Sequence, residues 1–539
     1  MNSVEFNLLY EPWVVVITNQ GVEREVSLIE AFEHAHEYRS LAGELPTQDF
    51  AILRLLLAIL YATFMRADIN GKQDKVESSD KALSRWKQIW DMKRFPIEAI
   101  KARLIPYEDC FYLFHPKRPF YQVAGLSRGT EYSASKLIGD LSESSNKPRL
   151  FPLRTGEAKK CLSNAEAARW LIYLNGFDDT SSKPSVRKAN MPSPGAGWLG
   201  KLGLVANEGN NLFETLMLNF VLISESGEVF GTSLATWELN EAHEKERELI
   251  PIPTDPLELL TLQSRRILLK RENGYVASYL LLGGDFFDRE NSFIEQMTVW
   301  RKDTSSKVDV YNPKRHRESR QMWRDFSTLL AETSETQRRP GVVAWVAKLR
   351  FNRLIADGVF RIRIAGIQFA DKDFYVDGII SDSLTMRASL LSDLNREWID
   401  GIGMILDITD KCIWHLGMFA QDLSLASGND DERNRAAVKA AAQERAYFAC
   451  DNPFRQWLAQ LNPEEDELLE KQEKWIEDMR RIVFNTAYEL VREAGEQAFS
   501  GRYKVGENAV TFENAPLAYR RFRSKVYQIS SFSKGGSNE

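Results

Sequence analysis

The chain has 539 residues, of which 43% are hydrophobic and 27% are charged, as is ordinary for a soluble globular protein. This composition excludes a mainly disordered chain, a collagen-like chain and a small disulfide scaffold. The 70 basic and 76 acidic residues give a formal net charge of −6, so any nucleic-acid surface must be local. The length allows two large domains or about three of ordinary size.

The cysteines and the apolar segments of the sequence indicate the cellular compartment in which the protein is expected. The four cysteines include no CxxC pair, so the sequence predicts neither a cysteine-rich zinc site nor a disulfide framework, and a reducing compartment is favoured. Met1–Phe6 lacks the basic start and apolar run of a signal peptide. The longest apolar stretch, Leu53–Phe64, is shorter than the about 20 residues that span a bilayer. We therefore expect a cytoplasmic protein that contacts no membrane.

The N-terminal region is predicted to begin with β structure and to continue in helices. The valine-rich run Trp13–Ile17 predicts a strand. Ser27, followed three residues later by Glu30, forms a capping-box pattern that predicts a helix start. A second helix is expected from Thr47, because apolar residues recur at intervals of three and four as far as Leu60.

The middle of the chain mixes irregular and β structure. Glycine, proline, serine and asparagine crowd residues 180–211, which predicts a long irregular loop. Arg266–Lys270 and Tyr275–Leu282 flank a turn-like Glu-Asn-Gly segment and predict a β-hairpin. Val359–Phe369 alternates apolar and basic residues, which predicts a half-buried strand with its basic residues on the outer face.

Near residue 383 long helical patterns replace the mixed structure. The gaps between them are short and polar, so we expect a four-helix bundle formed by Leu384–Phe419, Arg433–Phe448, Pro463–Phe499 and Ala515–Ile529. The predicted fold class is α+β, with a large mixed α/β N-terminal domain followed by this bundle. The expected divisions are 1–382 for the N-terminal domain, 383–530 for the bundle and 531–539 for a disordered tail.

The search for catalytic chemistry finds no established motif. The sequence contains no HExxH, GxxxxGK[ST] or GxSxG, and no GxGxxG that follows a strand. We therefore expect no catalytic residue, no resident metal and no cofactor, and binding is the favoured role. One enzymatic alternative stays open. It is a metal-dependent nuclease that uses Asp285, Asp288 or His316, although such an enzyme needs converging carboxylates.

Basic residues gather locally in this acidic protein. Residues 301–324 hold eight Lys/Arg against three acids, and residues 338–363 hold seven against one. Lysine and arginine contacts to phosphates dominate nucleic-acid affinity, and aromatic rings stack on unpaired bases. The patches favour a non-catalytic role with nucleic acid, and an adaptor that binds only protein is a further alternative. The last predicted helix adds Arg520, Arg521, Arg523 and Lys525.

Six short blocks occur in order along the chain: Phe6–Val14, Leu41–Asp49, Phe111–Gln122, Gln263–Ile267, Met297–Arg301 and Ala518–Arg523. Together they resemble the CasA family, the large subunit of Cascade, the type I-E CRISPR surveillance complex. One block alone is a weak signal, but six in the same order are specific. The resemblance implies the same architecture, a large mixed α/β domain and a C-terminal four-helix bundle.

The resemblance implies a subunit without an active site. In such complexes the guide RNA reads the target by base pairing, while the large subunit recognises a short flanking motif, the PAM, on duplex DNA and helps to open the strands for R-loop formation. The implied partners are the other Cascade subunits (backbone, small-subunit and guide 5′-end-binding proteins), the CRISPR RNA, double-stranded target DNA and a recruited helicase–nuclease. Some members carry a cysteine-rich zinc site, which we expect to be absent because no cysteine lies between Cys161 and Cys412.

The resemblance also implies where the PAM is read. The family's glycine-rich loop corresponds to Ser193, Gly195, Ala196 and Gly197, where missing side chains let the backbone approach DNA. Its basic minor-groove contact is assigned to Arg289. Its wedge corresponds to Ala370, Asp371, Lys372, Asp373 and Phe374. The family commonly places an amide at the tip of this wedge, so the acids here predict either a shifted register or a different PAM preference.

Two further contacts are expected. A loop between Leu141 and Cys161 matches the family's mobile loop near the 5′ handle of the guide, with candidate contacts at Asn146, Leu150 and Phe151. An exposed aromatic beside basic residues suits base stacking, and the alternative is that Phe151 is a core residue. On the last helix, residues 520 and 523 share one face and 521 and 525 another, so one basic stripe is expected to face the displaced strand or the flanking duplex.

Overall fold

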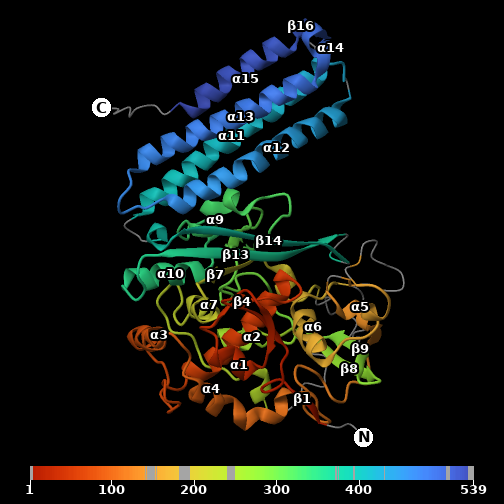
Figure 1. Cartoon of the computed structure of the whole chain (residues 1–539), viewed down its shortest axis with the longest axis vertical. Helices are drawn as coiled ribbons and strands as arrows, with labels where there is room; N and C mark the ends of the chain where they lie inside the picture. The colour runs from red at the N-terminus through yellow and green to blue at the C-terminus, as the bar shows by residue number, and fades with distance from the viewer. Residues whose placement is uncertain are drawn as a thin grey trace. The chain divides into compact units, whose positions relative to one another are not determined.

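The computed structural model forms two compact units (Figure 1). It describes residues 4–139, 141–142, 152, 154–180, 195–239, 249–370, 373, 375–391, 395–429, 431–505 and 510–531. The first unit comprises Met1–Arg320, Glu332–Leu354 and Phe360–Ser383. The second comprises Gln321–Ala331, Ile355–Val359 and Leu384–Glu539.

The first unit opens with a small antiparallel sheet in the order β3-β2-β4, formed by β2 (Val14–Thr18), β3 (Glu23–Val26) and β4 (Tyr38–Leu41). The Ser27 hydroxyl accepts from the Glu30 backbone N–H, and the Glu30 carboxylate accepts from the Ser27 backbone N–H. This reciprocal pair satisfies two donors at the start of α1 (Leu28–Glu33). The predicted strand and the predicted capping box are both confirmed.

The helix α2 (Pro46–Phe64) is the central helix of the first unit. Every residue from Thr47 to Phe64 is buried, which explains why apolar side chains occur all round the helix. Among the described residues, α2 is the one helix whose length and composition would suit a membrane span, and its whole apolar window is buried inside the fold. Its charged Arg54 lies in this interior and pairs with Glu295 at 2.9 Å.

Two three-stranded sheets carry the strands expected in the middle of the chain. The predicted hairpin is confirmed as β8 (Arg265–Glu272) and β9 (Tyr275–Gly283), with β6 (Thr130–Ser133) added beside β9. The predicted strand is confirmed as β13 (Val359–Ala370), which lies between β14 (Tyr375–Arg387) and β7 (Leu204–Glu208).

Two details of this region differ from the sequence prediction. The prediction of an irregular loop over residues 180–211 was wrong for β7. Leu204–Glu208 pairs with Arg361–Ala365, and because this partner is distant in the sequence, no local residue pattern indicates the strand. The basic residues of β13 are also not all on an open face. Arg363 binds the Asp49 carboxylate of α2 at 3.1 Å, whereas Arg361 is exposed.

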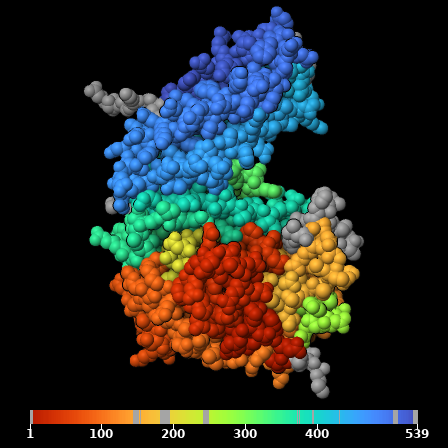
Figure 2. Space-filling view, viewed as in Figure 1, coloured from red at the N-terminus to blue at the C-terminus, as the bar shows by residue number. Residues whose placement is uncertain are grey.

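Short elements complete the first unit, and segments from the N-terminal part of the sequence, red and orange in Figure 2, cover most of its visible face. The strands are β1 (Glu5–Asn7), β5 (Tyr112–Phe114), β10 (Trp300–Lys302), β11 (Tyr311–Pro313) and β12 (Gln337–Arg338). The helices are α3 (Ser79–Met92), α4 (Ile97–Leu104), α5 (Ala134–Leu137), α6 (Asn164–Phe177), α7 (Leu212–Asn219), α8 (Pro256–Leu260) and α10 (Gly341–Phe351). The 3₁₀ turns are η1 (Ile105–Phe111), η2 (Gly156–Lys159), η3 (Leu199–Lys201) and η4 (Thr236–Glu238).

The second unit is a helical bundle whose long helices are α11 (Arg396–Ala426), α12 (Glu432–Gln460), α13 (Leu468–Glu493) and α15 (Ala515–Ser530). The helix α11 packs against the other three. In the core, the Trp475 indole N–H donates to the Thr409 hydroxyl at 3.1 Å, and the Trp475 ring meets the Phe454 ring edge-on. The predicted fold class, a mixed α/β part followed by a helical bundle, is confirmed.

The predicted ends of the bundle helices needed correction. Leu384–Arg387 continues β14, and η6 (Ala388–Leu391) follows it, so the first bundle helix begins at Arg396. The second helix runs on to Gln460 despite Pro453 within it. The third pattern, Pro463–Phe499, divides into α13 and α14 (Gly495–Ser500), and a hairpin made by β15 (Arg502–Val505) and β16 (Val510–Glu513) follows it.

A segment from the middle of the sequence also joins the bundle. It consists of η5 (Met322–Asp325) and α9 (Phe326–Leu330). The fully buried Trp323 packs against Phe454 with ring centroids 4.9 Å apart, and the Arg324 guanidinium lies over the Tyr447 ring. Part of the basic segment 301–324 therefore has a packing role.

Candidate nucleic-acid interface

The glycine-rich loop before η3 is fixed by close backbone packing. The Gly197 N–H donates to the Asp178 carbonyl at 2.9 Å, and a Cβ atom at Gly197 would lie 2.3 Å from the Gly176 carbonyl oxygen. Gly195 has φ = +69°, a conformation that glycine adopts without strain. Ala196 is buried, and Ser193 lies outside the described residues. The loop therefore needs glycine for its own geometry.

Arg265, the first residue of β8, anchors this loop. Its side chain is 1% exposed, its Nε donates to the Asp178 carboxylate at 2.5 Å, and its Nη2 donates to the Gly195 carbonyl at 2.7 Å. The neighbouring carboxylate, Asp179, binds the buried Lys136 ammonium. A guanidinium thus holds the loop backbone while its charge stays inside the protein.

The turn after β13 is hydrogen-bonded to the segment that contains Asp178, on which the glycine-rich loop also rests. Asp373 has φ = +64°, and its carbonyl accepts from the Thr180 N–H at 2.9 Å, two residues beyond Asp178. Both oxygens of its carboxylate accept from Arg315, each at 2.9 Å. Ala370, at the end of β13, is half-buried. Asp371, Lys372 and Phe374 lie outside the described residues.

The ring of Phe369 connects the turn to the loop. A Cβ atom at Gly200 would lie 3.1 Å from this ring, so η3 packs directly on it. The Arg315 guanidinium lies 5.5 Å from the ring centroid, within the range of cation–π attraction. The strand end, the arginine and the glycine-rich segment therefore support one another.

Lys201, the last residue of η3, lies in a strongly electropositive setting. Burial, together with the positive charges of Arg265, Arg289 and Arg315, lowers the pKa of Lys201 to about 8, and Asp373 opposes the shift only in part. Arg265 and Arg315 are each paired with a carboxylate, but the direction of this shift indicates that positive charge still outweighs negative charge around Lys201, which favours an anion near it. A phosphate is the natural ligand, since both ammonium and guanidinium groups bind it.

The structure thus brings together three segments that sequence reasoning assigned separately: the loop at Gly195–Gly197, Arg289, and the turn at Asp373. Arg289 is exposed, and within the described residues its side chain makes no ion pair or hydrogen bond. Sequence reasoning missed Lys201. It placed Arg315 only within a broad basic patch and Arg265 only within a resemblance block. The position of Lys201 just after the glycines was the available signal.

The family is decided by a match over most of the chain. The sequence matches the family described as CRISPR-associated protein Cse1 over residues 7–486. The chain belongs to the Cse1 family. The resemblance inferred from the six sequence blocks is therefore confirmed.

Individual Cse1 relatives agree with this assignment. A CasA/Cse1 protein of Thermus thermophilus is 30% identical over 331 residues, a match that spans 61% of this chain and 61% of the length of that relative. The crystal structure of Thermobifida fusca Cse1 has a TM-score of 0.81 at 29% identity, covering 97% of this chain and 98% of that one. A chain of a structure described as a CRISPR RNA-guided surveillance complex shares the fold, with a TM-score of 0.69 at 17% identity, covering 97% and 99%.

The basic helix of this Cse1 family member is only partly open to a ligand. All four predicted residues of α15 are exposed. Arg521, however, donates to the Asp422 carboxylate at 3.0 Å and also to Glu513, so two acids neutralise it. Arg523 lies over the Tyr527 ring at 5.7 Å, and Lys525 donates to the Gln528 amide oxygen. The 521/525 stripe is therefore less basic than the sequence suggested.

The residues of the alternative nuclease do not converge. Asp285 is buried and pairs with Arg266 at 2.5 Å, Asp288 is exposed, and the His316 ring nitrogen meets the Leu204 carbonyl at 3.0 Å. Across the described ranges, no group of three or more His, Cys, Asp or Glu side chains is placed to hold a metal ion.

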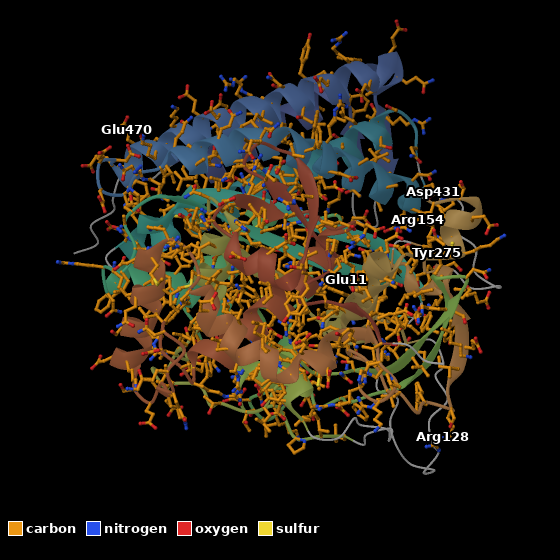
Figure 3. All side chains as sticks on the ribbon, turned by 60° about the horizontal axis from the view of Figure 1, so that its bottom comes forward. Glu11, Arg128, Arg154, Tyr275, Asp431 and Glu470 are labelled. Atoms are coloured by element: carbon orange, nitrogen blue, oxygen red, sulfur yellow. The ribbon has the colours of Figure 1, made fainter. Side chains whose placement is uncertain are left out.

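The loop assigned to the RNA end falls largely outside the described residues, and so do Asn146, Leu150 and Phe151. The nearby Arg154, labelled in Figure 3, is described. It donates to the Glu166 carboxylate at 2.9 Å and pairs with Glu44. Burial acts against its charge, but the two carboxylates outweigh burial and raise its pKa. The Arg154 side chain is therefore bound by carboxylates of the protein itself.

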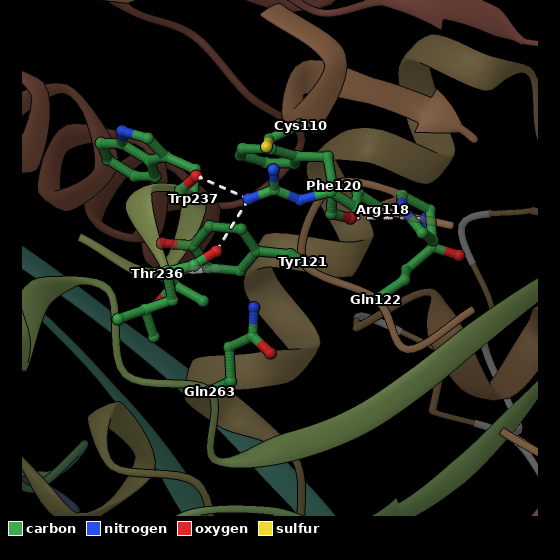
Figure 4. A pocket seen from close by; sticks show the side chains of 10 residues that line it. Cys110, Arg118, Phe120, Tyr121, Gln122, Thr236, Trp237 and Gln263 are labelled. Atoms are coloured by element: carbon green, nitrogen blue, oxygen red, sulfur yellow. Dashed lines mark hydrogen bonds between the residues drawn. The ribbon is translucent and has the colours of Figure 1, made fainter. Parts of the chain in front are cut away.

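A small cavity lies beside the block Arg118–Gln122 (Figure 4). Its volume of about 50 Å³ has room for a few water molecules. Arg118 spans it and donates to the carbonyls of Trp237 at 3.4 Å and Leu239 at 2.8 Å. Burial raises the pKa of the Cys110 thiol on its wall, which makes that thiol a poor nucleophile. This block therefore has a structural role here.

Proposed function

We propose that the chain is the non-catalytic large subunit of an RNA-guided CRISPR surveillance complex, and that it recognises the PAM on double-stranded DNA and helps to open the duplex. The observation that carries the proposal is the convergence of the glycine-rich loop, Arg289 and the Asp373 turn around Lys201. The family match supports it, and so does the shared fold with a chain of a surveillance complex.

The geometry suits a duplex that approaches the loop. The Gly195 backbone carries no side chain that would keep DNA at a distance, and the exposed Arg289 supplies a cation for a phosphate or for the minor groove. Arg315 is paired with Asp373, so its charge is partly masked until another anion competes for it. Lys372 and Asp371 belong to the proposed wedge that follows β13.

The other roles in the proposal come from the resemblance. The loop with Asn146, Leu150 and Phe151 contacts the end of the guide RNA or neighbouring subunits, and the complex recruits a helicase–nuclease in the cytoplasm once the R-loop has formed. The domain expected over residues 1–382 reads the PAM, and the bundle expected over residues 383–530 has its first helix from Arg396. The tail expected over residues 531–539 lies outside the described residues beyond Ser531. Arg520, Arg523 and Lys525 contact the displaced strand or the flanking duplex, and the two acids beside Arg521 favour a lesser role for it.

The test is a PAM-library binding assay on the assembled complex, with strand opening measured in parallel. Arg289→Ala should weaken binding of all sequences alike and lower the slope of log affinity against log salt by about 1, because the variant neutralises one phosphate fewer. Arg128→Ala, at an exposed arginine of the same unit that is not among the groups acting on Lys201, should change neither quantity.

The same assay tests the wedge assignment separately, with variants in the turn after β13. Lys372→Ala should change the PAM preference or slow strand opening. Asp373→Ala should change the preference while raising overall duplex affinity, because it releases the Arg315 guanidinium from its carboxylate partner. Unchanged preference and unchanged opening in both variants would overturn the wedge assignment.

A further inference from the structure

The open face of α11 carries large apolar side chains at helical spacing. Met404, Trp414 and Met418 lie on this face, and Met404 and Trp414 are 44% and 47% exposed. Lys411 is exposed between them, and Asp407 is the acid one turn before it. The helix is otherwise enclosed by α12, α13 and α15, so this face is a strip bordered by neighbouring helices.

The helix α12 forms one border of the strip. A Cβ atom at Gly417 would lie 2.8 Å from the Gln443 side chain and 2.9 Å from that of Lys439, so glycine lets the two helices come close. This approach places the Lys439 ammonium 4.8 Å from the centroid of the Trp414 ring and 3.5 Å from the Met418 sulfur. A cation is therefore held over an exposed aromatic ring.

The helix α15 forms the other border. The His415 ring meets the Trp414 ring edge-on, with centroids 4.8 Å apart. Burial and, after it, the positive charge of the nearby Lys525 lower the pKa of His415. Further along, Asp422 of α11 is neutralised by Arg521. Within the described part of the chain, Lys411, Lys439 and Lys525 have no carboxylate partner.

We propose that this strip, defined by Lys411, Trp414, Met418, Lys439 and Lys525, binds single-stranded nucleic acid, with a base stacked on Trp414 and backbone phosphates on the lysines. Tryptophan stacks on any base, and adjacent cations that lack acid partners complement a phosphodiester chain. The same three lysines disfavour an apolar protein helix as the occupant. The site rests on the proposed function, which already assigns Lys525 to the displaced strand or the flanking duplex, and it adds a stacking platform at Trp414 to that role. It needs neither a PAM nor paired bases.

The purified full chain would be titrated into fluorescein-labelled oligothymidylate and followed by anisotropy. Trp414→Ala should weaken binding roughly 5- to 150-fold, the range expected when one base stack is removed, while Trp414→Tyr should retain most of the affinity. Phe448→Ala is the matched control, because Phe448 is an aromatic 80% exposed on α12, and it should change nothing.

Variants of the lysines provide a second, independent test, the salt dependence of binding. Lys439→Ala combined with Lys525→Ala should lower the slope of log affinity against log salt by about 0.7 for each phosphate that is no longer neutralised. If folded Trp414→Ala binds the oligomer as the parent chain does, the proposal is overturned. It is also overturned if that variant loses only association with another protein. Because the probe is unpaired and carries no PAM, failure here leaves the duplex proposal intact, and the reverse is equally true.

Discussion

At the proposed interface, anion binding is linked to the protonation of Lys201. Its pKa of about 8 lies well below the ordinary lysine value of 10.5, since burial and three arginines oppose its charged form. An anion that binds beside it favours the charged form and so raises that pKa. Binding therefore takes up a proton when the pH is near or above 8, and below this range the lysine is already charged.

The affinity for duplex DNA should consequently be level at lower pH and fall as the pH rises through about 8. Lys201→Met should bind more weakly wherever the lysine is charged in the complex and should lose this pH dependence, while Lys201→Arg should keep the affinity and also lose the dependence, because arginine stays charged. The measurement is the dissociation constant of one fixed duplex at constant salt. A pH profile unchanged in Lys201→Met would show that other groups titrate.

At the level of single residues, part of the candidate site could be predicted from the sequence. Gly195–Gly197 and Arg289 were assigned by resemblance, and the structure places them near each other. Lys201 and Arg315 were not assigned, because their importance depends on a tertiary arrangement in which segments from residues 178, 201, 315 and 373 meet. Arg521 was overrated for the same reason, since its neutralising acids Asp422 and Glu513 come from other elements.

At the scale of elements, the glycine-rich loop is fixed by contacts that leave no room for a side chain. Gly197→Ala would place a Cβ atom against the Gly176 carbonyl, 2.3 Å away before relaxation. We expect it to lower the free energy of unfolding by about 1–3 kcal/mol, as overpacking does, and to weaken duplex binding by displacing the Gly195 backbone.

Gly156→Ala is the matched control for that change. Gly156 has a positive φ, +57°, as Gly195 does, but a Cβ atom there meets nothing within 4 Å. It should cost about 1 kcal/mol of backbone strain and leave duplex binding unchanged. Urea unfolding and duplex titration of both variants make the comparison, and equal losses of binding would contradict a special role for the loop before η3.

Elements with strong local signals were predicted well, and those that depend on distant partners were not. The capping box at Ser27 and the hairpin of β8 and β9 were predicted correctly, because each is specified by neighbouring residues. The strand β7 was missed because its partner is β13, and Leu384–Arg387 was misassigned to a helix because pairing in β14 outweighs its helical pattern.

At the scale of the whole molecule, one buried ion pair joins the core helix to the proposed interface. The Glu295 carboxylate accepts two hydrogen bonds from Arg54 of α2 at 2.9 Å, and it also accepts from the Trp198 indole at 2.8 Å. Trp198 directly follows the glycine-rich loop. A change in the pair should therefore affect both the stability of the first unit and the position of the loop.

Glu295→Ala should lower the free energy of unfolding by about 3–5 kcal/mol, because it leaves the Arg54 guanidinium buried without a partner. The double variant Arg54→Met/Glu295→Gln should lose less, since no charge is stranded and glutamine still accepts from Trp198. Chemical denaturation followed by tryptophan fluorescence measures both. If the double variant were as unstable as Glu295→Ala, the unpaired charge would not be the cause.

The same pair has a consequence for synthesis on the ribosome. Arg54 and Glu295 are separated by 241 residues, so α2 is complete long before its partner is translated. At about 5–20 residues per second, this interval lasts on the order of tens of seconds. For much of this interval α2, an apolar helix with the composition of a membrane span, lacks some of its packing partners, because α6, α7 and α8 are still being translated. The nascent chain should therefore depend on chaperone binding over this window, and slow translation between residues 64 and 295 should lower the soluble yield.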